Sequence, residues 1–189
     1  MDKVLRDKRL YEFLEKVDKD FASQVKSRGC EHCGAVLHRA DYERKPRGAQ
    51  FGPSWDRRCS FCCSRDGCRK RHTPASVRFL GRKVYAGVIV VLVSAMMHGP
   101  NEHRLKRLEQ ELAIDRRTLK RWRQWWTQIF VQCAFWRAER GRFREPMARA
   151  QMPLCLVKAF GAQQMNGLIR LMSFLSPITT QSCMEVRVM

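Results

Sequence analysis

The sequence predicts a mainly α-helical protein that carries a small β zinc ribbon. Apolar residues recur at helical spacing over most of the chain, a loop-rich stretch interrupts them, and that stretch holds six of the nine cysteines. We expect an amphipathic helix in residues 1–28, a zinc ribbon in 29–75, a helical domain in 76–140 with a helix-turn-helix at 102–126, and a helical tail in 141–189.

The first helix is indicated by apolar residues three or four positions apart, with Lys, Asp and Glu between them. These residues are Leu10, Phe13, Leu14, Val17, Phe21 and Val25, and we expect the helix to end near Gly29. From there to Pro74, short alternating segments broken by Gly and Pro predict hairpins and turns.

The cysteines of this stretch have the spacing of a metal site. Cys30 and Cys33 form a C-x2-C turn, and Gly34 lets the backbone fold back so that amide groups can face the sulfurs. For the second turn we favour Cys63 and Cys68, which enclose the turn-forming segment SRDG. Four thiolates from two such turns complete a tetrahedron around zinc.

Two further cysteines leave the second turn open to other pairings. Cys62 is the first substitute and Cys59 the second, whereas His32, His38 and His72 are better explained as residues of a basic loop than as ligands. Zinc in a fully thiolate site would be structural, because no position stays open for a substrate. The alternative is a redox thiol site or a set of unliganded cysteines.

The balance of charge favours a polyanionic partner. The 189 residues include 37 Lys and Arg against 18 Asp and Glu, a formal charge of +19. Several of these cations, among them Arg69, Lys70 and Arg71, directly follow the last cysteine of the cluster. A metal ion could hold this loop-rich segment rigid. Its cations could then bind phosphates with little further loss of conformational entropy.

Two segments bear on location. The longest apolar run, residues 84–97, is shorter than the roughly 20 residues of a spanning helix, so we expect a buried helix and no membrane partner. The beginning of the chain does not resemble a secretory signal, so we expect a cytoplasmic, nucleoid-associated protein. In that reducing compartment, clustered cysteines favour metal ligands over disulfides.

The helical domain begins with an apolar helix, expected over residues 77–97, that the sequence HGP closes. A polar helical pair is expected from 102 to about 136. Asp115 would cap its second helix by accepting a bond from the amide of Arg117 or Thr118, while Leu119 and Trp122 point to the core.

The residues left outward on that second helix are nearly all cations. They are Arg116, Arg117, Thr118, Lys120, Arg121 and Arg123. An arginine on a helix in the major groove can pair bidentately with guanine, while neighbouring cations hold phosphates. We therefore expect Arg116, Arg117, Thr118, Lys120 and Arg121 to contact double-stranded DNA.

The large aromatic residues between 122 and 136 recur at helical spacing, which favours core positions over stacking platforms for single-stranded nucleic acid. Two helices are expected in the tail, around residues 154–160 and 164–175. The segment LSPITTQS that follows has the composition of a fraying end.

Two motifs together resemble parts of insertion-sequence transposases. The stretch LEQELAIDRRTLKRW resembles the helix-turn-helix of bacterial transposases and regulators, with Glu109, Ala113 and Asp115 where a small residue, Gly and Ser are usual. CEHCG followed by CCSRDGCRKRHTP resembles the zinc-ribbon region at the front of many such transposases. The combined resemblance covers residues 29–126 and implies recognition of DNA ends.

The resemblance does not reach a catalytic domain. Transposases of this kind cut DNA with three carboxylates that hold two metal ions, yet the acidic residues after Trp126 are Glu139, Glu145 and Glu185. We therefore expect a protein that is not an enzyme: a transposase-associated accessory protein or a transposase fragment, with a transposase or another mobile-element protein as a possible partner. A stand-alone transcription regulator and a structured-RNA-binding protein are the alternatives.

Overall fold

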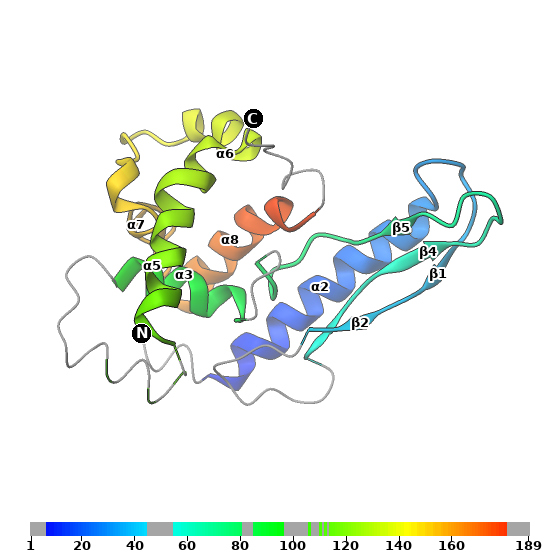
Figure 1. Ribbon diagram of the computed structural model, residues 1–189, viewed down its shortest axis with the longest axis horizontal. Coiled ribbons are helices and arrows are strands. Elements are labelled where there is room, and N and C mark those ends of the chain that lie inside the picture. Colours follow the sequence, from blue (N-terminus) through cyan, green and yellow to red (C-terminus); the bar gives the residue numbers. More distant parts are fainter. Residues whose placement is uncertain are drawn as a thin grey trace.

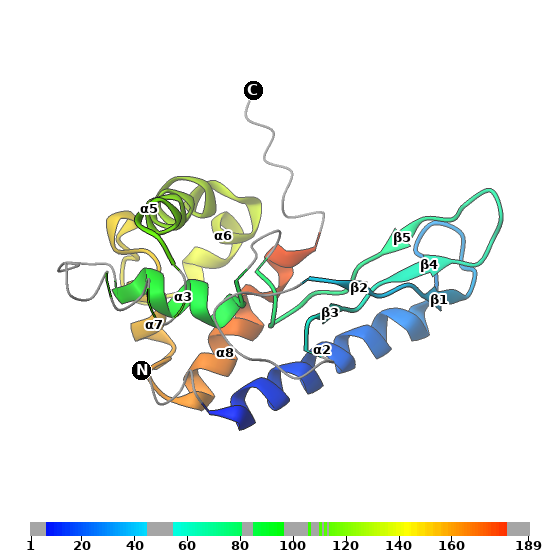
Figure 2. The ribbon, with the colours of Figure 1, turned by 60° about the horizontal axis from the view of Figure 1, so that its bottom comes forward.

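The computed structural model describes residues 7–44, 55–80, 85–96 and 114–180, together with Lys106, Gln110 and Leu112. The chain is mainly helical and has a small antiparallel sheet. A body of helices lies at one end and an arm with the sheet at the other, and the long helix α2 runs from the body along the arm (Figures 1 and 2).

Helix α2 (Lys8–Arg28) belongs to both ends of the molecule. The Asp7 carboxylate caps it by accepting a hydrogen bond from the Arg9 amide at 3.0 Å, and Gly29 follows its last turn with a φ of 77°. Leu10 and Leu14 are buried in the core of the helical body, whereas Ala22 belongs to a separate core beneath the sheet. The expected helix and its end are confirmed.

The arm contains strands β1 (Leu37–Arg39), β4 (Phe61–Cys63) and β5 (Arg71–His72), paired antiparallel in the order β1-β4-β5. A second antiparallel pair is formed by β2 (Tyr42–Glu43) and β3 (Arg57–Arg58). Leu37 lies opposite Cys63, while Cys62 lies opposite both His38 and Arg71. Because side chains alternate along a strand, Cys63 and Cys62 belong to opposite faces of the sheet.

The helical body is built around α3 (Gly87–Met96), in which every residue from Gly87 to Ala95 is buried. It contacts α5 (Arg116–Gln124), α7 (Leu154–Ala159) and α8 (Met165–Leu175). Between α5 and α7 the chain forms the π-helix η1 (Trp125–Ile129), the 3₁₀ helices η2 (Phe130–Gln132), η3 (Arg140–Arg142) and η4 (Arg149–Gln151), and the short helix α6 (Ala134–Glu139).

The apolar helix begins later than the sequence predicted. Residues 77–80 are not helical, Phe79 forms an isolated β-bridge with Ala86, and α3 starts at Gly87. The cause is a buried hydrogen-bond network around Asp18, whose carboxylate accepts bonds from the Val77 amide at 2.7 Å and the Ser76 hydroxyl at 2.6 Å. These bonds hold the backbone at residues 77–78 in a bend that precedes the helix.

Arg78 completes this network. Its Nε lies 2.9 Å from the Asp18 carboxylate, and its terminal nitrogens each donate at 2.9 Å to the carbonyls of Trp55 and Arg57. The exposed fractions of the Asp18 and Arg78 side chains are 0 % and 2 %. The pair therefore ties α2, β3 and the entry to the helical body together in the interior.

The second half of the body differs from the expectation in two places. The helix expected to run to about residue 136 is broken at Cys133, whose extended backbone (ψ 149°) starts α6 and whose sulfur accepts a bond from the Trp136 amide at 3.4 Å. Helices α7 and α8 match the two expected tail helices. The prediction of a fraying end is wrong for η5 (Ser176–Thr179). In this segment Ser176 and Ile178 are buried, and the Thr179 hydroxyl accepts a hydrogen bond from the Ser76 amide.

None of the helices formed by the described residues is both long and apolar enough to cross a membrane.

Candidate metal centre and nucleic-acid surface

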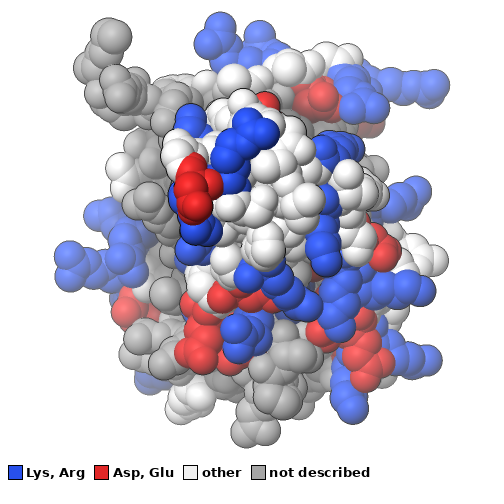
Figure 3. Space-filling model, turned by 90° about the vertical axis from the view of Figure 1, so that its right-hand side faces the viewer, with Lys and Arg blue, Asp and Glu red and all other residues white. Residues whose placement is uncertain are grey.

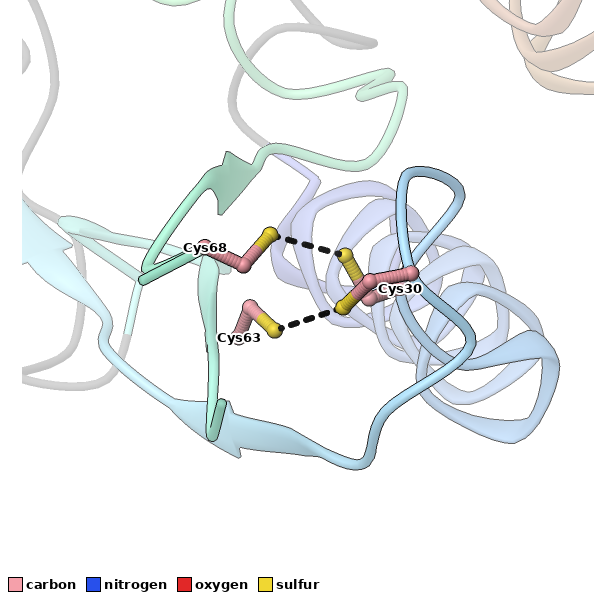
Figure 4. A group of neighbouring side chains, drawn as sticks. Cys30, Cys63 and Cys68 are labelled. Atoms are coloured by element: carbon pink, nitrogen blue, oxygen red, sulfur yellow. Dashed lines mark hydrogen bonds between the residues drawn. The ribbon is translucent and has the colours of Figure 1, made fainter. Parts of the chain in front are cut away.

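Four cysteines meet between the end of α2 and the sheet. The sulfur atoms of Cys30, Cys33, Cys63 and Cys68 all lie within 4.8 Å of one another. The labelled side chains in Figure 4 point toward a common centre, with 3.8 Å between the sulfurs of Cys30 and Cys68 and 3.4 Å between those of Cys33 and Cys63. Four sulfurs at about 2.3 Å from a tetrahedral ion would lie about 3.8 Å apart, so the cluster is close enough to bind a metal ion.

The first pair is set by a tight turn at the end of α2. The Cys30 carbonyl accepts hydrogen bonds from the amides of Cys33 at 3.3 Å and Gly34 at 2.8 Å, and the Cys30 amide donates to the Ala35 carbonyl at 2.9 Å. Gly34 has a φ of 70°, a conformation that glycine adopts without a steric penalty. The role that the sequence predicted for Gly34 is confirmed.

The second pair is set by the turn between β4 and β5. The Arg65 amide donates to the Cys63 sulfur at 3.4 Å, and Gly67 has a φ of 70°. Arg69, two residues after Gly67, also has a positive φ of 43°, at the point where the chain turns back toward β5. The chosen set of four cysteines is therefore the set that the fold brings together.

Cys62 and Cys59, the two substitutes considered for the second cysteine turn, lie outside the cluster. Cys62 faces the other side of the sheet, where its thiol contacts the Arg69 carbonyl at 3.4 Å. Cys59 is buried two residues before β4, and that burial raises the pKa of its thiol. Cys59 belongs to the core under the sheet, whereas the alternation of side chains along β4 places Cys62 outside the cluster.

Two of the clustered thiols, those of Cys33 and Cys63, have pKa values shifted in opposite directions. Hydrogen bonds from the Ala35 amide and from the Cys63 thiol lower the pKa of Cys33 to about 7, whereas burial raises the pKa of Cys63 to about 12. A bound cation favours the thiolate form of every ligand, so metal binding would release protons from this cluster.

His72 does not lie in an exposed basic loop, so the sequence-based expectation is wrong for this histidine. It is buried, and its Nε2 lies 3.3 Å from the Cys30 sulfur. In this position the ring can donate a hydrogen bond to a thiolate, which is how surrounding groups commonly orient metal ligands. His38 and His32 are exposed, as expected for histidines of a basic loop.

The second candidate site is the outward face of α5. The Asp115 carboxylate caps this helix by accepting a bond from the Thr118 amide at 2.6 Å, and Leu119 and Trp122 are buried, as the sequence predicted. The exposed residues of the helix are Arg116, Arg117, Lys120, Arg121, Arg123 and Gln124. In Figure 1 the helix lies at the front of the body, with α3 behind it.

Thr118 is the exception among the outward residues predicted for this helix. Only 5 % of its surface is exposed, because its place on the helix turns it toward the core with Trp122. Its hydroxyl accepts a hydrogen bond from Arg121 at 2.9 Å. The expectation that Thr118 faces outward is wrong.

Within the described part of the chain, Lys120, Arg121 and Arg123 form no ion pair. Among the described carboxylates, that of Asp115 interacts electrostatically with Arg121 and Arg117 without forming an ion pair with either. The first helix of the predicted helix-turn-helix falls mostly outside the described residues: Lys106, Gln110 and Leu112 are helical, and Leu112 packs against the main core.

Two cations of the arm contact other groups of the protein. Arg69 pairs with Asp66 at 2.6 Å, and Arg71 donates to the Ala40 carbonyl and the Ser60 hydroxyl. Lys70 is exposed. The end of the molecule that lies on the right in Figure 1 has acidic side chains interspersed among its Lys and Arg residues (Figure 3).

The aromatic residues after α5 form packing contacts with one another. Trp126 contacts Trp125 and Phe130 in edge-on arrangements, with ring centroids 4.7 and 4.9 Å apart, and Phe130 lies 5.3 Å from Trp136. Trp122, Trp126, Phe130 and Trp136 are all buried. The core positions predicted for these residues are confirmed.

None of the protein families, curated proteins or solved structures compared with the chain matches it.

Proposed function

We propose that this protein is a zinc-containing DNA-binding protein that contacts double-stranded DNA through the outward face of α5. The observation that carries the proposal is the composition of that face: its exposed residues are five cations and one glutamine, opposite a buried face of Thr118, Leu119 and Trp122. A helix of this kind fits the major groove, where arginine and lysine can contact both phosphates and base edges.

Zinc is the metal that best fits the four-cysteine cluster. Four thiolates from two turns are the donor set of structural zinc sites, and soft sulfur ligands disfavour Mg²⁺ and Ca²⁺. All four positions are supplied by the protein, so the ion would stabilise the arm and would leave no position for catalysis. We therefore propose a binding role and not an enzymatic one.

Duplex DNA is favoured over structured RNA by the shape of the contact surface. The major groove of B-form DNA admits an α-helix, whereas the corresponding groove of A-form RNA is too deep and narrow for side chains to read. The arm, with the exposed Lys70, would contact neighbouring phosphates and would add affinity without sequence preference.

The biological setting that we propose comes from the resemblance to insertion-sequence transposases. In that setting the protein is a mobile-element accessory protein or a transposase fragment that recognises DNA ends, with a transposase as its protein partner. A stand-alone regulator would use the same chemistry on a promoter. Binding assays that compare element ends with the promoter of the protein's own gene separate the two.

The first prediction tests DNA binding itself. We expect Arg117→Ala to weaken binding to the preferred duplex by about 1–3 kcal/mol if this residue contacts a base edge. Fluorescence anisotropy with labelled duplex DNA at fixed salt, in competition with unlabelled duplex RNA, measures this change.

Lys16→Ala is the matched control, because Lys16 is an exposed cation on α2. It removes one positive charge from a surface that the proposal does not use, so it should leave affinity nearly unchanged. Equal losses for the two variants, or a wild-type preference for RNA, would contradict the proposed function.

A further inference from the structure

The exposed residues of α5 form two rows that differ in chemistry. At about 100° per residue, Arg117, Arg121 and Gln124 follow one another at spacings of four and three, and so do Arg116, Lys120 and Arg123. We call the first set the crest and the second set the flank. The crest lies nearly opposite the buried residues Leu119 and Trp122, whereas the flank lies about a quarter turn away from the crest.

The two rows carry different side-chain types. The crest has Arg, Arg and Gln, the residues whose planar groups form bidentate pairs with guanine and adenine in the major groove. The flank consists of cations alone, which suits the phosphate oxygens at the groove edge. When such a helix enters the major groove, the crest faces the base edges and the flank faces the phosphates of one strand.

One crest residue is already held in place. Arg121 donates to the hydroxyl of the buried Thr118 at 2.9 Å, and the Thr118 amide is in turn fixed by the Asp115 carboxylate. The arginine is therefore partly ordered before any ligand binds, which lowers the entropic cost of a specific contact. It keeps further N–H donors for a base edge.

The flank continues beyond the end of α5. Thr127 in the π-helix η1 is the next position of this row, and its carbonyl accepts a hydrogen bond from the Arg149 Nε of η4. Arg149 is exposed, and this contact holds its guanidinium beside Thr127 at the end of the row of cations. From residue 116 to residue 127 the helix rises about 16 Å, which corresponds to about five base steps of one strand.

The geometry points to two separate roles on this surface: Arg117, Arg121 and Gln124 contact base edges, while Arg116, Lys120, Arg123 and Arg149 contact the phosphates of one strand. This inference rests on the proposed binding of duplex DNA. It adds Gln124 as a residue that determines sequence preference and Arg149 as a phosphate contact from a different part of the chain.

The test combines selection of preferred sequences from a randomised duplex pool with anisotropy titrations at several salt concentrations. Gln124→Ala should abolish the preference at one base position, a change of about 5- to 150-fold between the best base and the others, and should leave affinity for random duplex within about twofold. Arg149→Ala should leave the selected sequence unchanged, weaken binding to all duplexes alike, and reduce the salt slope by about 1.

Gln163→Ala is the matched control for Gln124→Ala, because Gln163 is an exposed glutamine between α7 and α8. An unchanged selected sequence for Gln124→Ala, a changed one for Arg149→Ala, or wild-type binding without any sequence preference each overturns the assignment of roles while duplex binding itself stands. Absence of duplex binding by the wild-type protein overturns the proposed function and this inference together. Melting curves that match those of the wild type confirm that the variants are folded.

Discussion

At the scale of single residues, neighbouring cysteines have different environments because they alternate across a strand. Cys62 and Cys63 are adjacent in the sequence, yet Cys63 faces the cluster and Cys62 faces the opposite side of the sheet. Spacing identified the four cysteines that meet but left Cys62 and Cys59 as substitutes. The pairing of Leu37 with Cys63 removes that ambiguity, because it fixes which side of β4 points toward α2.

This alternation gives a prediction with a built-in control. We expect Cys63→Ser to lower the bound metal to well below one equivalent and to reduce the melting temperature, because a hydroxyl is a poor replacement for a thiolate ligand. Cys62→Ser, the same change one residue away, should leave both unchanged. Metal analysis and circular dichroism melting measure the effect, and equal behaviour of the two variants would refute the ligand assignment.

The pairing of Asp18 with Arg78 is a residue-scale feature that the sequence did not reveal. The two residues are far apart along the chain, and each looks like an ordinary surface charge in its own segment. Burial of such a pair costs desolvation energy, which is offset here by hydrogen bonds from the Ser76 hydroxyl and the Val77 amide to Asp18 and from Arg78 to two carbonyls. Only the tertiary arrangement supplies these partners.

At the scale of elements, α2 and α5 begin in the same way. Each has an aspartate at its N-terminus whose carboxylate accepts a bond from a backbone amide of the first turn, Asp7 in α2 and Asp115 in α5. Hydrogen bonds from Thr118 lower the pKa of Asp115. The contribution of this cap to stability is therefore present above the ordinary carboxyl pKa and is lost as the pH falls through the lowered value.

The shared capping mode allows the two helices to be compared directly. We expect Asp115→Ala and Asp7→Ala each to lower the melting temperature by about 2–4 °C, as the loss of a helix cap does in a chain of this length. Only Asp115→Ala should also weaken DNA binding, because it releases Thr118 and with it Arg121. If Asp7→Ala weakens DNA binding as much as Asp115→Ala does, the loss reflects general stability. The proposed role of the α5 cap in DNA binding would then be refuted.

The Asp115 cap of α5 and the apolar spacing of α2 were predictable because caps and apolar spacing are local signals. The π-helical and 3₁₀ segments after α5 were not, since the contacts of Trp125, Trp126 and Phe130 with one another depend on packing in three dimensions. The late start of α3 has a similar origin, because Asp18 from a distant helix holds the backbone of Val77.

At the scale of the whole molecule, the chain has two hydrophobic cores that share one helix. The larger core fills the helical body and includes Leu10 and Leu14 of α2, while the smaller one lies under the sheet with Ala22, Leu37 and Phe61. The smaller core also contains the clustered cysteines, so a metal ion would replace much of the apolar packing that so small a sheet lacks.

This arrangement predicts how the protein responds to loss of metal. Removal of the ion by a strong chelator should speed amide hydrogen exchange in β1, β4 and β5 and leave α3, α7 and α8 protected, because the larger core does not involve the cluster. Hydrogen exchange followed by mass spectrometry, before and after metal is restored, measures this. Loss of protection throughout the chain, or none in the sheet, would show that the two cores are not independent.

The amino-acid order alone determined the mainly helical class, the Asp115 cap of α5 and the choice of four favoured ligands among six cysteines, because capping, periodicity and short ligand spacing act over a few residues. The orientation of Thr118 toward the core, the buried Asp18–Arg78 pair, the contact of His72 with Cys30 and the position of Arg149 beside η1 were decided by the tertiary structure. Each of these joins residues or surfaces whose proximity arises only when separate elements pack, and no local pattern records that proximity.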